Sequence, residues 1–438
     1  MRTLTRRQSI RILSTGVLAF PRLTRCTEHP DALRFGVVGF GASGETLTVQ
    51  LLGSDKRNVV SAICDISEHQ QKRGEALVRS VSGQTPNLYT DCLEMLQREK
   101  GRLDAVIVAT PDCFHEYHSL SCFEAGLHVY CESPIADSSA SARRMVAAAK
   151  ASNLIFQYAS LLGKNPWMCY CKRNFVNGAQ LLGPILLVDS ELRSFPQRRN
   201  VSTRTQGVPD VVLSKYGYQS NDELLNWRFA KKFGVSYELS CFVQQADFFN
   251  YMLSAYPRGL VASSCEMSGT PLARAVSVSL DYEIAGQSVL CNSRFFPVSA
   301  GENGQEYKIT GWYGIVKRTI LDQYVQQIDA SLGTSQDEAL RVRTKWEEAF
   351  RKGVLGKEDR QKEEMDGYIP LPFERGHNRK FHFSVDKEYD GMSFGIRSFV
   401  KAIRDGSPAC GTAQDGLASL ILAEGVQESI RTGKRLFF

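Results

Sequence analysis

The feature of this chain that most restricts its fold is a short apolar run leading directly into a glycine-rich turn. Residues 33–44 read LRFGVVGFGASG, with apolar side chains up to Val38 and glycines at positions 39, 41 and 44. A short apolar run that ends at glycine is typical of a buried strand. Gly39 is expected to make the tight turn, Gly41 to bring backbone close to a ligand, and Gly44 to let the next helix pack against the strand. The pattern predicts a strand, a turn and a helix in that order.

A second strand and an acidic residue follow at the spacing expected for a dinucleotide site. Residues 59–63, VVSAI, are apolar and lead to Asp65, which lies 21 residues beyond Gly44. A helix N-terminus after a glycine turn binds the pyrophosphate, and a carboxylate after the second strand accepts the ribose hydroxyls. This carboxylate would repel a 2′-phosphate, so the pattern predicts NAD, with NADP less favoured. The expected cofactor contacts in this part of the chain are Gly39, Phe40, Gly41, Ala42, Ser43, Gly44 and Asp65.

Apolar strands and amphipathic helices alternate from residue 33 to about residue 158. Further strands are predicted over 105–109, 127–131 and 154–159, with helices over 115–125 and 138–151. This alternation is the mark of a parallel, doubly wound sheet. Ligands bind such sheets at the carboxyl ends of the strands. The expected cofactor contacts therefore also include Thr110, Pro111, Asp112, Glu132 and Pro134.

Two long stretches resemble one known family. Residues 109–136, ATPDCFHEYHSLSCFEAGLHVYCESPIA, come after GFGASG and CDIS and look like the Gfo/Idh/MocA family, named for glucose-fructose oxidoreductase, inositol dehydrogenase and a rhizopine-catabolism protein. Residues 395–434 are similar to the two closing helices of that family. The resemblance covers nearly the whole chain from Leu33 to Phe438.

The resemblance implies an α/β fold with two domains. The first is a Rossmann domain with a doubly wound parallel sheet, expected over residues 31–159. The second, expected over residues 160–438, is an α/β domain for substrate and oligomerisation, with a large open and mainly antiparallel sheet. That sheet often forms the interface of a homo-oligomer in the family. Residues 1–30 would then be a targeting peptide or disordered.

The sequence of the second domain fits this expectation moderately. Strands are predicted over 185–192, 260–266, 276–284 and 288–295, and one more over 306–317. Residues 337–366 form a charged insertion with helical spacing. Because acids and bases are mixed throughout it, a solvated surface is favoured over a nucleic-acid patch.

The family also has a set of catalytic residues, and this sequence departs from it. In the family, proton transfer falls to the lysine of a Glu-Lys-Pro motif and to an aspartate and a histidine four residues apart. Residues 132–134 are Glu-Ser-Pro, so that Ser133 stands at the lysine position. Counting back from Asp247, Gln244 stands where the histidine is expected and Ser240 where the aspartate is. Serine and glutamine hydrogen-bond a hydroxyl, but their pKa values are unsuited to proton transfer near neutral pH.

Other residues are weaker candidates for the chemistry. Tyr237, Lys231 or Lys232 would supply a proton acceptor, although a solvated surface position explains them as simply. His115 matches a family position at the nicotinamide end of the cofactor, where a catalytic role and a structural role at a helix start are equal alternatives. By the same resemblance, the residues expected to line the substrate pocket are Trp227, Arg228 and Asp247, with His377 and His382 as further candidates.

Composition and charge exclude several classes of function. The hydrophobic fraction of 43% and the charged fraction of 23% are those of an ordinary globular protein, and no apolar run is long enough to span a bilayer. The net charge is +6, but six arginines fall in the first 25 residues, so the body carries no nucleic-acid footprint. The 12 cysteines show no zinc spacing, and no metal site is expected.

The N-terminal segment has the composition of a targeting peptide. Residues 1–27 contain arginines and no acid. Residues 5–10, TRRQSI, followed by the mildly apolar residues 12–20, resemble a twin-arginine export signal. Export is the expectation, with a mitochondrial or cytoplasmic location left open.

Three functions remain open at this point. The first is an NAD-dependent oxidoreductase that acts on a small sugar, cyclitol or related polyol with altered catalytic groups. The second is a redox-neutral NAD-dependent glycosidase or lyase, in which the sugar is oxidised only transiently. The third is a binding protein that keeps the nucleotide site without the chemistry.

Overall fold

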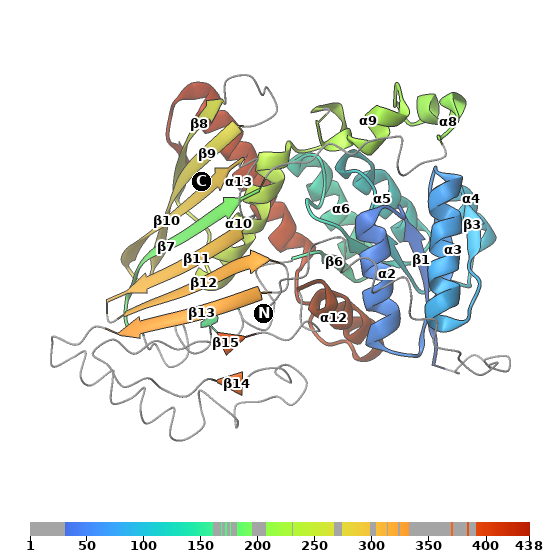
Figure 1. Ribbon diagram of the computed structural model, residues 1–438, viewed down its shortest axis with the longest axis horizontal. Helices are drawn as coiled ribbons and strands as arrows, with labels where there is room; N and C mark the ends of the chain where they lie inside the picture. The colour runs from blue at the N-terminus through green and yellow to red at the C-terminus, as the bar shows by residue number, and fades with distance from the viewer. Residues whose placement is uncertain are drawn as a thin grey trace, which may run out of the picture.

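Two sheets organise the computed structural model (Figure 1). The proposed targeting segment, the charged insertion 337–366, His377 and His382 lie outside the described part of the chain. The structure describes residues 31–160, 168, 171–172, 176, 182–194, 207–229, 231–266, 274–297, 304–312, 314–322, 325–332, 369–370, 383–384 and 391–438.

The first sheet has six parallel strands in the order β3-β2-β1-β4-β5-β6. Its strand order changes direction between β1 and β4, which places a crevice at their carboxyl ends. This confirms the predicted doubly wound sheet. The strands are β1 (Leu33–Val38), β2 (Asn58–Cys64), β3 (Asn87–Tyr89), β4 (Ala105–Val108), β5 (His128–Cys131) and β6 (Phe156–Tyr158).

Helices cover both faces of this sheet, because its central strands are apolar on both sides. Helices α2 (Ala42–Ser54) and α3 (Glu68–Ser82) pack on one face together with α12 (Gly391–Asp405), which comes from near the end of the chain. The other face carries α4 (Cys92–Arg98), α5 (His115–Glu124) and α6 (Ser139–Ala151).

The second sheet has ten strands and is mixed. Its order is β14-β15-β13-β12-β11-β7-β10-β9-β8-β16, in which only the β7–β10 pair is parallel. Its strands are β7 (Ile185–Arg193), β8 (Gly259–Glu266), β9 (Arg274–Ile284), β10 (Gln287–Phe296), β11 (Gly304–Gly311), β12 (Gly314–Asp322), β13 (Val325–Leu332), β14 (Ile369–Pro370), β15 (Phe383–Ser384) and β16 (Leu436–Phe437).

Helices α10 (Tyr237–Leu253) and α13 (Ala413–Thr432) cover one face of this sheet (Figure 1). Alternate residues of β9, such as Val278 and Leu280, are buried, as expected for a strand with one covered face. Among the described residues, no helix covers the opposite face, where Leu290 and Phe296 are exposed. None of the described helices is long and apolar enough to cross a membrane.

One predicted strand was wrong. The run 306–317 is not a single strand but parts of β11 and β12, which pair antiparallel with Gly311 opposite Gly314. Two glycines separated by two residues permit a tight hairpin turn, and this signal outweighs the apolar pattern on either side. The other predicted strands are found within two residues of their expected ends.

Candidate functional site

The glycine-rich turn has the geometry that its sequence predicts. Gly39 has a φ of +87°, and a Cβ there would lie 2.6 Å from the carbonyl oxygen of Ala109. A Cβ on Gly44 would lie 2.0 Å from the carbonyl oxygen of Gly39, so only glycine lets α2 approach β1 this closely. Gly41 differs, because a Cβ there would meet nothing within 4 Å. Its backbone therefore borders open space at the start of α2, where a pyrophosphate fits.

Asp65 follows β2 and forms part of the wall of the same crevice. Its two carboxylate oxygens accept hydrogen bonds from the backbone N–H groups of Phe40, at 2.7 Å, and Ser67, at 2.8 Å. Burial raises the pKa of this carboxyl, and the two N–H donors oppose that shift. Each carboxylate oxygen has a second lone pair, so Asp65 can still accept a ribose hydroxyl.

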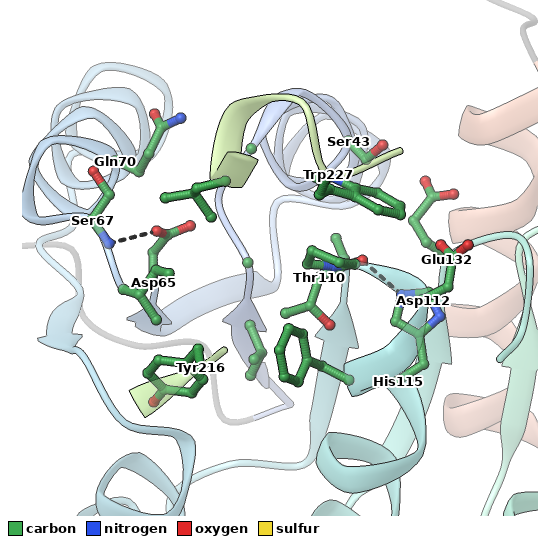
Figure 2. A pocket seen from close by; sticks show the side chains of 18 of the residues that line it. Ser43, Asp65, Ser67, Gln70, Thr110, Asp112, His115, Glu132, Tyr216 and Trp227 are labelled. Carbon is green, nitrogen blue, oxygen red and sulfur yellow. Dashed lines mark hydrogen bonds between the residues drawn. The ribbon is translucent and has the colours of Figure 1, made fainter. Parts of the chain in front are cut away.

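A cavity of about 390 Å³ joins the two domains at this crevice. Figure 2 shows Asp65, Ser67 and Gln70 at one end and Asp112 and Glu132 toward the other, with Trp227 nearby. Of the predicted cofactor contacts, Gly39, Gly41, Ala42, Ser43, Asp65, Thr110, Pro111, Asp112, His115 and Glu132 line it. Phe40, Gly44 and Pro134 are buried behind that lining.

His115 connects two loops of the Rossmann domain. Its Nε2 lies 2.8 Å from the carbonyl oxygen of Thr110, and its Nδ1 lies 3.0 Å from that of Pro134. Burial lowers the pKa of this histidine to about 4, although the two carbonyls favour the charged form. A neutral ring has one N–H group, so it donates to only one of these carbonyl oxygens, although both nitrogens face backbone oxygens. This geometry supports the structural alternative for His115 over the catalytic one.

The Glu-Ser-Pro motif follows β5. One oxygen of Glu132 accepts a hydrogen bond from the backbone N–H of Ser133 at 2.9 Å. The other oxygen, Oε1, is buried and has no hydrogen-bond partner among the described residues. The hydroxyl of Ser133 lies 3.4 Å from that of Tyr158, which is itself buried. Ser133 therefore places a neutral hydroxyl in the cavity wall.

Arg228 brings the positive charge to this end of the cavity. Its guanidinium lies over the Trp227 ring, 4.3 Å from the ring centroid. Its charge lowers the pKa values of Asp112 and Glu132, against the larger effect of burial, which raises both. The net result for Asp112 is a pKa raised to about 7. Trp227 and Arg228, predicted as substrate contacts, both line the cavity.

Of the four site residues predicted on α10, only Tyr237 lines the cavity. Tyr237 lines the cavity, and its hydroxyl lies 2.8 Å from that of Ser194. Ser240 and Asp247 are buried, and Asp247 accepts a hydrogen bond from Ser160. Neither they nor Gln244 belong to the cavity lining. Their spacing puts them on one helix face, and that face lies outside the cavity wall.

Of the two lysine candidates, Lys232 makes its contacts outside the cavity lining. Lys232 Nζ lies 2.9 Å from the carbonyl oxygen of Gly217 and 2.9 Å from Glu223. The side chain of Lys231 is outside the described part of the structure. Lys232 therefore supports a surface loop rather than proton transfer.

Sequence reasoning missed the segment that covers the cavity. Residues 207–229 and 231–233 contain α8 (Asp210–Lys215), α9 (Asn221–Leu225) and two short 3-10 turns, η4 (Trp227–Phe229) and η5 (Lys231–Phe233). Tyr216 packs edge-on against Phe114 with ring centroids 6.0 Å apart, and Lys215 pairs with Asp91 at 2.8 Å. Aromatic residues crowded around Gly217 were the available signal. Cavity-lining residues that were missed are Ser67, Gln70, Thr90, Cys92, Phe114, His118, Tyr216, Tyr218, Leu224 and Phe229.

Comparison with known proteins agrees with this geometry. Residues 33–160 match the model of the Gfo/Idh/MocA family, described as an oxidoreductase family with an NAD-binding Rossmann fold. Inositol 2-dehydrogenase 1 of Saccharopolyspora erythraea is 34% identical over 119 residues, which are 26% of this chain and 32% of that protein. The chain thus spans about a third of the length of this curated relative.

Solved structures extend the likeness over the second domain. The WlbA dehydrogenase from Bordetella pertussis, in complex with NADH and UDP-GlcNAcA, has a TM-score of 0.65 at 16% identity, covering 93% of this chain and 99% of that one. Levoglucosan dehydrogenase, in complex with NADH and L-sorbose, has a TM-score of 0.66 at 15% identity, covering 93% and 98%. At these identities the likeness shows the fold. Residues 33–160 therefore match the NAD-binding Rossmann domain of the Gfo/Idh/MocA family, and the fold across both domains is that of these solved dehydrogenases.

Proposed function

We propose that this protein is an NAD-dependent oxidoreductase that oxidises a secondary alcohol of a sugar, cyclitol or related polyol. The observation that carries the proposal is the cavity shared by the two domains. One end has the open glycine turn and Asp65, and the other has carboxylates, an arginine and aromatic rings. Sugar and cyclitol names among the relatives support the substrate class.

Residues at one end of the cavity would bind the cofactor, and residues at the other end would position the substrate. Gly41 and the start of α2 would hold the pyrophosphate, and Asp65 the adenosine ribose. NAD bound there would supply the hydride acceptor. The Trp227 ring and the Arg228 guanidinium would position the polyol, since an aromatic face packs on C–H groups and a guanidinium donates to hydroxyls. Ser133 can hydrogen-bond the substrate but cannot take its proton.

We infer a preference for NAD over NADP from Asp65. Its carboxylate lies in the cavity wall and is held by two backbone N–H groups, so it cannot swing away from a 2′-phosphate. Two negative groups in contact at this position would be repulsive.

The test is direct. Purified protein is incubated with NAD⁺ and a panel of inositols, aldoses and sugar acids, and the absorbance of the reduced cofactor is followed from pH 6 to 9. Reduction with at least one member, together with saturable NAD binding, supports the proposal. Failure of NAD to bind at millimolar concentration would overturn it.

A second candidate is a nucleotide-binding protein without hydride transfer. Ser133 at the lysine position, and the absence of Gln244 and Ser240 from the cavity lining, favour this alternative. Tight NAD binding without reduction by any polyol, and without cleavage of aryl glycosides, would support it. Glycoside cleavage with no net reduction would instead support the redox-neutral enzyme.

We also propose that the uncovered face of the second sheet is the interface of a homo-oligomer. Val261 on β8 and Leu290 and Phe296 on β10 are exposed on that face, with β9 between the two strands. Analytical ultracentrifugation should show a dimer or larger species, and Leu290→Glu should dissociate it. A monomer at micromolar concentration would contradict this arrangement.

A further inference from the structure

The proposed oxidation needs a proton acceptor, and the cavity wall contains few groups that can serve. His115 has both ring nitrogens against backbone carbonyls, and Asp65 has both oxygens engaged at the opposite end. The Tyr237 hydroxyl is paired with Ser194, and burial raises its pKa further. Among the described cavity-lining carboxyls, this leaves Asp112 and Glu132.

These two carboxyls follow neighbouring strands of the first sheet. Strands β4 and β5 pair in parallel, with Val108 opposite Cys131, and the backbone N–H of Glu132 donates to the carbonyl oxygen of Val108 at 3.0 Å. Asp112 and Glu132 therefore emerge at the same edge of the sheet (Figure 2). Their exposed fractions are only 1% and 8%.

Each carboxyl accepts a hydrogen bond from a backbone N–H group. Asp112 accepts a hydrogen bond from the backbone N–H of Val235 at 3.3 Å, and Gly234 packs directly against its carboxyl group. Glu132 is held by Ser133 N–H, while its Oε1 has no partner among the described residues. A buried acceptor without a partner is costly, so this oxygen is suited to receive a hydrogen bond from a ligand.

The charges around the pair favour proton exchange near neutral pH. Burial raises the pKa of Asp112, Arg228 opposes it, and the charge of Glu132 raises it again, to about 7 in total. Burial also raises the pKa of Glu132, against Ser133 N–H and Arg228. The charge of Arg228 acts on both buried carboxyls, and the charge of Glu132 disfavours ionisation of Asp112.

We propose that Glu132 accepts the substrate hydroxyl proton and that Asp112 shares it, a carboxyl pair that replaces the missing lysine at Ser133. This rests on the proposed oxidoreductase function. NAD⁺ bound in the cavity would supply the hydride acceptor, so that the carbinol C–H bond would break and its electron pair would leave with hydrogen as hydride. The O–H bond breaks, its proton goes to Glu132 Oε1, and a C=O bond forms. The products are a ketone, NADH and a protonated pair, which then releases the proton to solvent.

The test compares Glu132→Gln, Asp112→Asn and the matched control Glu116→Gln. Glu116 is a carboxylate on α5 that pairs with Arg144 and lies outside the cavity lining. For each protein, NAD affinity is measured by fluorescence titration, and turnover is measured by the absorbance of NADH. The protonation of the carboxyl groups is measured by infrared titration of the protein in the presence of NAD.

If a polyol of the panel is oxidised, turnover is the measurement that tests the proposal. Glu132→Gln should lower kcat by about 10²- to 10⁴-fold, the usual contribution of a positioned acid or base, with NAD affinity kept within about threefold. Asp112→Asn should flatten the rise of kcat near pH 7, and Glu116→Gln should match the parent. A Glu132→Gln protein that retains more than about a third of the parent kcat would overturn the assignment.

If no polyol is oxidised, infrared titration is the measurement that tests the proposal. A carboxyl proton released between about pH 6 and 8 in the parent, and missing from both cavity variants, supports the pair. Full ionisation of both carboxyls below about pH 5 would sink it. Because carboxyl titration does not require NAD binding, failure of the cofactor assay overturns the proposed function separately.

Discussion

The two ends of the cavity differ in how closely they follow the family pattern. At the adenosine end, the glycine turn, α2 and Asp65 have the residues and geometry of a dinucleotide site. At the other end, Ser133 occupies the position where the sequence resemblance predicts a lysine, and the α10 residues 240, 244 and 247 do not line the cavity. The comparison separates two requirements, because cofactor binding depends on backbone shape while hydride chemistry also needs a group with a suitable pKa.

The largest expected effect is at the adenosine end. Gly41→Val would place a branched side chain in the open space beside α2, and NAD affinity should fall by more than about 1,000-fold, or 4 kcal/mol. The melting temperature should change little, because a Cβ there meets no neighbour. The matched control is Gly53→Val in the same helix, where added atoms are also free and the cavity is distant. Retained NAD binding in the Gly41 variant, by calorimetry, would show that the pyrophosphate lies elsewhere.

At the opposite end of the cavity, Asp112 should make the free energy of unfolding depend on pH. The pKa of Asp112 is about 7 in the folded protein and 3.8 in an ordinary environment, so the folded state holds an extra proton between these values. The free energy of unfolding should therefore fall as the pH rises from about 4 to 7, by about 4 kcal/mol from this group. Asp112→Asn should remove that part of the slope in urea titrations. An unchanged slope in the variant would show that the Asp112 carboxyl is solvated.

His115 contacts the loops that follow β4 and β5. Its removal should lower the free energy of unfolding more than it lowers kcat. His115→Ala removes the ring that bridges the carbonyls of Thr110 and Pro134, at a cost of about 1–3 kcal/mol. The parent should also lose stability as the pH falls from 6.5 toward about 4, since the folded state resists protonation of this ring. His69→Ala, on the exposed surface of α3, is the control. A selective loss of kcat at unchanged stability would restore His115 as a catalytic residue.

The smallest effect concerns the choice between cofactors. The parent should bind NAD at least about tenfold more tightly than NADP, equivalent to 1.4 kcal/mol, and Asp65→Asn should narrow that ratio. Asp55→Asn, which removes a carboxylate outside the cavity lining, should leave the ratio unchanged. Equal affinities of the parent for both cofactors in a fluorescence titration would remove the preference.

Local signals in the sequence were sufficient for the first sheet. Its strands are apolar and bounded by glycine or polar residues, and the distance from Gly44 to Asp65 already implies one crossover helix. The second sheet was less accessible, because β11 and β12 were read as one strand despite Gly311 and Gly314. Short edge strands such as β16 have too few residues to show a period.

The candidate site was predictable where one motif supplies it and not where distant segments meet. Thr110, Asp112 and Glu132 follow strands that the sequence places at one edge, and all three line the cavity. Tyr216 and Tyr218 reach it from a segment without a recognised motif. Sequence spacing also cannot show that Glu132 Oε1 has no hydrogen-bond partner among the described residues. This property depends on the three-dimensional position of every neighbour.

Helix α12 makes completion of the first domain depend on a segment that is synthesised after most of the second sheet. Its Phe399 packs against Phe35 of β1 and Tyr130 of β5, with ring centroids 6.5 and 5.6 Å apart. Gln157 in β6 also donates to the carbonyl oxygen of Gly395 at 2.7 Å. Until the ribosome releases residue 399, this apolar face of the Rossmann sheet stays exposed, and the contact that closes it has very high sequence separation. Chaperone dependence during synthesis, and poor solubility of residues 31–160 expressed alone, follow from that order of events.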